Sequence, residues 1–84
     1  MNRSQDRLLR EIFTDPVSGK IAWRDIEAPL ASLGAEINEG QGSRVRIALN
    51  GVRAVFHRPH PQKETSRGAV RSMRRFLTEA GVKP

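Results

Sequence analysis

The sequence predicts an α+β fold in which helices cover one face of a three-stranded antiparallel sheet, in the order α-α-β-β-β-α. Two segments that alternate apolar and polar residues, 44–49 and 52–57, flank Asn50-Gly51, a pair that favours a type I′ hairpin turn. Segments with apolar residues at three- and four-residue spacing, typical of amphipathic helices, stand on both sides of this hairpin. Eighty-four residues without a cysteine predict one small domain, residues 1–84, with no disulfide to support its core.

The first helix is expected over residues 4–13, with either Ser4 or Asn2 capping its start. Its apolar side chains recur on one side: Leu8, Leu9, Ile12 and Phe13. Residues 14–19 contain a proline and a glycine and are expected to form a turn. This helix and turn, residues 1–20, precede the rest of the fold.

A short extended segment, residues 21–23, is predicted next, and it places Trp23 in the core. The second helix is expected over residues 25–33 and ends before Gly34, a common C-terminal cap residue. Its buried stripe consists of Ile26, Leu30 and Leu33. Pro29 would cost about 3 kcal/mol inside a helix, so we expect either a start no earlier than Asp25 or a local kink.

The sheet is predicted from a weak first strand, residues 35–39, a turn at residues 40–42, and the hairpin. A two-residue turn at Asn50-Gly51 fixes the register, because paired positions must then sum to 101. One face is apolar and belongs to a core: Leu49 with Val52, Ile47 with Ala54, and Val45 with Phe56. The opposite face pairs Ala48 with Arg53, Arg46 with Val55, and Arg44 with His57.

The last helix is expected over residues 67–80, capped by Thr65 or Ser66 and ended by Gly81. Its apolar stripe consists of Val70, Met73, Leu77 and Ala80. Four arginines cluster on another side: Arg67, Arg71, Arg74 and Arg75. Such a row is usually a solvated helix face, so it predicts phosphate binding only weakly.

The charge is uneven and suggests a polyanionic partner. Residues 1–42 carry five Lys and Arg against seven acids, whereas residues 43–84 carry ten against two, and the whole chain has a net charge of +6. No apolar run approaches the roughly 20 residues of a membrane span, and the N-terminus lacks the apolar stretch of a secretory signal. We therefore expect a cytoplasmic protein with a nucleic acid as partner and no membrane.

The arginine-bearing face of the hairpin is the candidate site. Arginine binds phosphate through two parallel hydrogen bonds. The predicted phosphate-binding set is therefore Arg44, Arg46 and Arg53, extended by Arg58 and Lys63. Two histidines are candidates for proton transfer, His57 and His60, because an imidazole titrates near pH 6.5. No metal or cofactor is expected, since the two histidines lie on an extended, proline-bounded segment and do not face together. The acids Asp25 and Glu27 stand at a helix start, where they favour the helix dipole.

The chain resembles the HicA-like toxin family over residues 24–83. The resemblance rests on five short matches in order: Leu33-Gly34, Gly42-Ser43, His60-Pro61 with residues 62–64, residues 68–72 and residues 77–81. It implies a fold like the double-stranded RNA-binding domain and an RNA-cleaving toxin of a type II toxin–antitoxin pair. The implied partners are mRNA and a HicB-type antitoxin that masks the active surface.

One position departs from the family pattern. The family's catalytic histidine follows the Gly-Ser pair, and Arg44 occupies that place here. Because His57 is expected directly across the hairpin from Arg44, with Cβ atoms about 5 Å apart, we predict that His57 performs the proton transfer while Arg44 holds the phosphate. The alternatives are a non-catalytic RNA-binding module and a small domain that docks an acidic protein partner.

Overall fold

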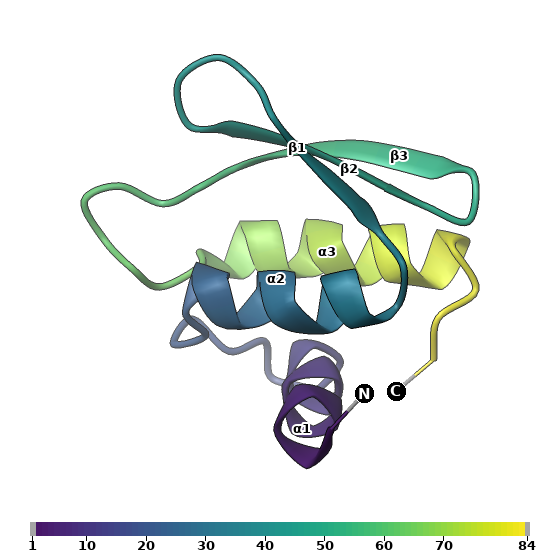
Figure 1. Cartoon of the computed structure of the whole chain (residues 1–84). Helices are drawn as coiled ribbons and strands as arrows, with labels where there is room; N and C mark the ends of the chain where they lie inside the picture. The colour runs from purple at the N-terminus through teal and green to yellow at the C-terminus, as the bar shows by residue number, and fades with distance from the viewer. Residues whose placement is uncertain (1, 84) are drawn as a thin grey trace.

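The sheet, a pair of helices and a third helix form three successive layers in the computed structural model, which describes residues 2–83 (Figure 1). The elements follow the predicted order: α1 (Arg3–Ile12), α2 (Trp23–Ser32), β1 (Glu36–Glu39), β2 (Arg44–Leu49), β3 (Val52–His57) and α3 (Arg67–Glu79). The sheet is antiparallel, with β2 between β1 and β3. The α+β prediction is therefore confirmed.

The hairpin has the predicted register, with Arg44 opposite His57 at one end and Leu49 opposite Val52 at the other. Asn50 and Gly51 both have positive φ values, 51° and 82°, as a type I′ turn requires. The Asn50 side-chain amide also donates a hydrogen bond of 2.8 Å to the carbonyl of Ala80, at the end of α3. The turn thus sets the strand pairing and joins the sheet to a helix.

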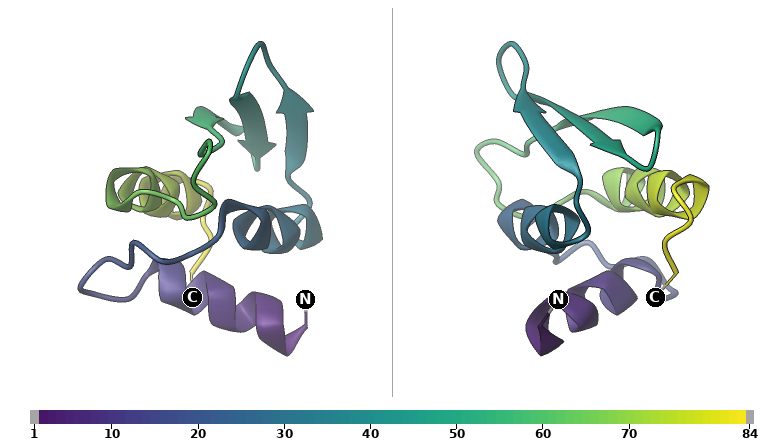
Figure 2. Two further views of the ribbon diagram at one scale, coloured as in Figure 1. Left: turned by 90° about the vertical axis from the view of Figure 1, so that its left-hand side faces the viewer. Right: turned by 45° about the vertical axis from the view of Figure 1, so that its right-hand side comes forward.

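The core lies between the hairpin and the two helices beneath it. Four hairpin side chains are buried there: Val45, Ile47, Leu49 and Phe56. The ring of Phe56 lies between Trp23 of α2 and Phe76 of α3, with centroid distances of 5.7 and 6.0 Å. Helices cover only this face, so the opposite face of the sheet is open (Figure 2).

Helix α1 forms the third layer, against α2 and α3 on the side away from the sheet (Figures 1 and 2). It buries Leu9 and Ile12, and Asn2 caps its first turn by accepting a hydrogen bond from the Gln5 amide. Arg74 of α3 satisfies carbonyls at its C-terminal end, because its guanidinium donates to the carbonyls of Ile12 and Thr14 at 2.7 and 2.6 Å. The added N-terminal segment is therefore firmly attached to the rest of the fold.

The predicted extended segment at residues 21–23 is wrong in its last residue, because α2 begins at Trp23. Only Ala22 makes an isolated bridge, to Glu64 in the loop before α3. The Trp23 indole N–H then donates to the carboxylate of Glu27 one turn later, which favours a helical start at Trp23. The start expected no earlier than Asp25 is likewise wrong.

Pro29 lies inside α2, and its side chain is fully buried. A proline lacks the N–H that would pair with the carbonyl four residues earlier, so it weakens the helix locally. Burial of its apolar ring in the core offsets part of that cost. At the start of α3, Ser66 is the N-cap and accepts from the Ala69 amide, whereas Thr65 is buried.

Candidate nucleic-acid interface

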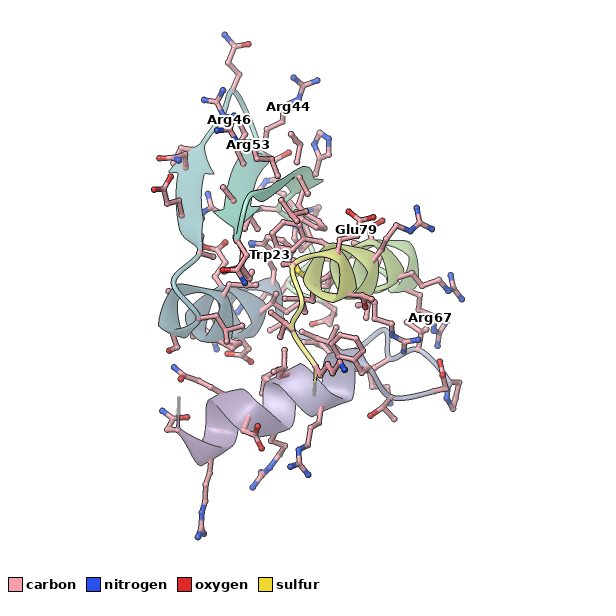
Figure 3. The ribbon with its side chains drawn as sticks, turned by 90° about the vertical axis from the view of Figure 1, so that its right-hand side faces the viewer. Trp23, Arg44, Arg46, Arg53, Arg67 and Glu79 are labelled. Carbon is pink, nitrogen blue, oxygen red and sulfur yellow. The ribbon has the colours of Figure 1, made fainter. Side chains whose placement is uncertain are left out.

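The open face of the sheet gathers the predicted cationic side chains. Side chains along a strand alternate between the two faces of a sheet. The residues next to the buried positions of β2 and β3 therefore lie on the open face. The exposed residues on this face of the hairpin are Arg44, Arg46, Arg53, Val55 and His57. Figure 3 shows the three labelled arginines of this face on the side of the sheet away from Trp23 and the helices. The sequence-predicted core of the site is thus brought together on one surface.

His57 and Arg44 are direct cross-strand partners at the end of the hairpin. The next pair along is hydrogen-bonded, with the Arg58 amide donating to the Ser43 carbonyl at 2.8 Å. Hydrogen-bonded and non-hydrogen-bonded pairs alternate along an antiparallel ladder, so His57 and Arg44 form a non-hydrogen-bonded pair. The side chains of such a pair lie closer together than those of a hydrogen-bonded pair. Within residues 2–83 neither side chain is engaged in a salt bridge or hydrogen bond, so both can contact a ligand.

The twisted sheet forms a shallow depression of about 700 Å³ on this face. Strand β1 contributes Glu36, Asn38 and Glu39 to its lining, and the hairpin contributes Arg46, Arg53 and Val55. Of the two acids, Glu39 is paired with Arg58, whereas Glu36 lies beside Ala48, which in turn pairs with Arg53. Two arginines therefore face one carboxylate that has no ion pair among residues 2–83, so the depression favours an anionic ligand.

Arg58 lies apart from this face and already has two carboxylate partners. Its guanidinium contacts Glu27 of α2 at 2.9 and 3.2 Å and Glu39 at the end of β1 at 2.6 Å. The hydrogen bonds that Arg58 donates to these carboxylates, first to Glu27 and then to Glu39, raise the pKa of Arg58 above its ordinary value. Glu27 therefore neutralises an arginine and also accepts from an indole, in addition to its place in the first turns of α2. We leave Arg58 out of the proposed phosphate-binding set.

The loop between β3 and α3 carries His60 and Lys63, and both side chains are exposed. Its second half is attached to the start of α2, because the Trp23 amide donates to the Lys63 carbonyl at 3.1 Å and the Thr65 amide to Ile21 at 2.7 Å. His60 lies beyond the end of the sheet, three residues after His57. Over residues 2–83 no group of three or more His, Asp or Glu side chains is placed to hold a metal ion.

The arginines of α3 do not act as one cluster. Arg67 donates to the Val17 carbonyl at 3.2 Å, and Arg74 binds the end of α1 and Asp15. Arg71 and Arg75 are exposed and, in the part of the chain that the structure describes, take part in no salt bridge. Two of the four therefore hold the N-terminal segment rather than a ligand.

Comparison with known proteins gives one match. The family described as HicA toxin of bacterial toxin–antitoxin matches residues 23–82, which include the whole sheet, α2 and α3 and leave out α1. No curated protein and no solved structure shows a significant match. Among residues 2–83 no helix has the length and apolar character needed to cross a bilayer.

Proposed function

The chain belongs to the HicA toxin family, and from this membership we propose that it binds mRNA on the open face of its sheet and cleaves it without a metal ion. Membership also implies a cognate antitoxin, and we propose a HicB-type protein that covers this face, with both proteins acting in the cytoplasm. The observation that carries the proposal is the pairing of His57 with Arg44 on an uncovered surface rich in arginine.

The proposed reaction starts at the 2′-hydroxyl of the nucleotide that precedes the cleaved bond. His57 accepts the hydroxyl proton as the oxygen attacks the neighbouring phosphorus. Arg44, next to it, stabilises the negative charge that develops on the phosphate oxygens. The 5′-oxygen leaves with a proton, for which the exposed His60 is the candidate donor. The products are a 2′,3′-cyclic phosphate and a 5′-hydroxyl end.

Neighbouring phosphates are assigned to Arg46 and Arg53, which share the open face with the histidine. Lys63, exposed in the loop before α3, extends this set. Arginine side chains suit this task because their planar forks bind phosphate oxygens through two hydrogen bonds.

The test is cleavage of a single-stranded RNA by the purified chain in excess EDTA. We expect cyclic-phosphate ends, loss of cleavage in His57→Gln, and unchanged cleavage in Arg75→Gln, an exposed arginine of α3 that serves as the matched control. Cleavage that disappears with EDTA contradicts the metal-free mechanism. Cleavage by His57→Gln at the rate of the unaltered chain contradicts the role of His57.

A second candidate is a non-catalytic RNA-binding module of the same family. The observation that favours it is Arg44 at the position where the family carries its catalytic histidine. In the same assay this candidate predicts RNA binding that weakens steeply with salt, and no cleavage. A domain that only docks an acidic protein predicts neither RNA binding nor cleavage at physiological salt.

A further inference from the structure

Val55 stands out on the open face of the sheet. This residue is 56% exposed, and among residues 2–83 it is the one large hydrophobic residue whose side chain the structure leaves exposed. Arg46 lies directly across from it on β2, and Arg53 and His57 lie two residues away on β3. The long aliphatic stems of arginines often cover a neighbouring apolar group, but here they leave most of the valine open to solvent. An apolar contact point thus lies next to arginine side chains on the open face.

A hollow of about 360 Å³ adjoins this valine, lined by Gly40, Gln41, Arg44, Arg46 and Val55. Gly40 shapes it, because a Cβ at this position would lie 3.0 Å from the Cβ of Arg44. The Gly40 amide donates a hydrogen bond of 2.9 Å to the Arg44 carbonyl, and the absence of a Cβ lets the Arg44 side chain lie close to this backbone. A volume of this size falls in the range of small-ligand pockets, roughly 300–1,000 Å³.

We infer that this hollow is a binding site for one unstacked nucleotide of the RNA, next to the phosphate held by Arg44. The inference rests on the proposed function. The apolar side chain of Val55 contacts the face of the base or ribose. Arg44 and Arg46 bind the phosphates on either side, and the Gln41 amide faces the polar edge of the base. In a duplex the base faces are stacked and hidden, so this contact favours single-stranded RNA.

The geometry favours a nucleotide over a peptide segment from an acidic protein. An extended peptide gains most of its affinity by pairing its backbone with a free strand edge. The hollow lies between the turn before β2 and Val55 of β3, over the central strand β2, whose backbone is already paired with β1 on one side and β3 on the other. A nucleotide needs no backbone partner, and it combines phosphates with an apolar base face, as this hollow combines arginines with Val55.

The first experiment measures binding of a fully 2′-O-methylated single-stranded RNA, which cannot be cleaved through its 2′-oxygen. Val55→Thr keeps the branched shape of the side chain and removes apolar surface. We expect it to weaken RNA binding about three- to tenfold, as the loss of a small apolar contact predicts. Its affinity for inorganic polyphosphate, which has charge but no base, should stay the same. The salt dependence of RNA binding should also stay the same, because no phosphate contact is lost.

The second experiment uses the absence of cysteine in the chain. Val55→Cys introduces a single thiol, and iodoacetamide should alkylate it at least about tenfold more slowly when the RNA is bound. Ser72→Cys, at an exposed position of α3, is the matched control and should react equally with and without RNA.

Three results would overturn the nucleotide-binding site. The first is an unchanged RNA affinity in Val55→Thr, and the second is a Val55→Cys thiol that still reacts with iodoacetamide in the RNA complex. The third is equal protection of this thiol by polyglutamate, which would indicate an acidic protein as the ligand. The first two results leave the proposed function unaffected, whereas the third would favour the candidate that docks an acidic protein. Failure of the unaltered chain to bind RNA at all would instead refute the proposed function itself.

Discussion

Arg58 tests whether arginines that are paired with carboxylates act in stability, while arginines on the open face act in binding. The sequence places it in the phosphate-binding set, whereas the structure pairs it with Glu27 and Glu39. Arg58→Met keeps much of the apolar stem and removes the guanidinium. The expected result is a less stable protein whose RNA affinity and salt dependence are unchanged.

The magnitude follows from the two contacts. The Glu39 side chain is 68% exposed, so that ion pair contributes at most about 1 kcal/mol. Glu27 is only 24% exposed and accepts two hydrogen bonds from Arg58, so losing this charged partner costs roughly 1.5–2 kcal/mol. The free energy of unfolding should therefore fall by about 2 kcal/mol, which lowers the melting temperature by roughly 8–16 °C in a domain of this size.

The assay is thermal and urea unfolding followed by circular dichroism, together with RNA titrations at several salt concentrations. Arg44→Met makes the same chemical change on the open face, where the arginine has no carboxylate partner among residues 2–83. It should alter the free energy of unfolding by less than about 0.5 kcal/mol and weaken RNA binding. The reasoning is refuted if Arg58→Met is as stable as Arg44→Met, or if it loses RNA affinity without losing stability.

Three further predictions concern other parts of the molecule. Gly51→Ala should destabilise the protein by about 1–2 kcal/mol in urea unfolding, because φ at this position is 82°; an unchanged midpoint would contradict the type I′ turn. Arg46→Gln should weaken RNA binding and reduce the salt slope by about 1, whereas Arg75→Gln should leave both unchanged; equal effects would show that charge acts without regard to face. Arg74→Met should speed hydrogen exchange in α1 more than in the sheet, since Arg74 binds the Ile12 and Thr14 carbonyls. Uniform exchange would show that α1 does not depend on this arginine.

The features that sequence predicts well here depend on short-range physics. The Asn50-Gly51 pair dictates its own turn, and that turn sets the whole hairpin register. Once the register is known, alternation decides which side chains are buried and which are open. The pairing of His57 with Arg44 follows from the same argument, while the role of this pair in catalysis remains a prediction.

The features that sequence missed depend on partners far along the chain. Glu27 and Glu39 lie 31 and 19 residues from Arg58, and no local pattern shows that all three meet. The contact between the Trp23 indole and Glu27 favours a start of α2 at Trp23, whereas the sequence pattern indicates for Glu27 only a place near the helix dipole. Arg74 likewise reaches acceptors about 60 residues away, so the four arginines of α3 looked alike in sequence.

The position of α1 has a practical consequence for work with this protein. The described ends of the chain, residues 2 and 83, both lie on the α1 side of the molecule, away from the sheet (Figures 1 and 2). A fluorescent protein, purification tag or surface linker attached at either end is therefore directed away from the arginines on the open face of the sheet. Immobilised or labelled protein should keep the open face of the sheet accessible, which allows binding kinetics to be measured on sensor surfaces without redesign of the chain.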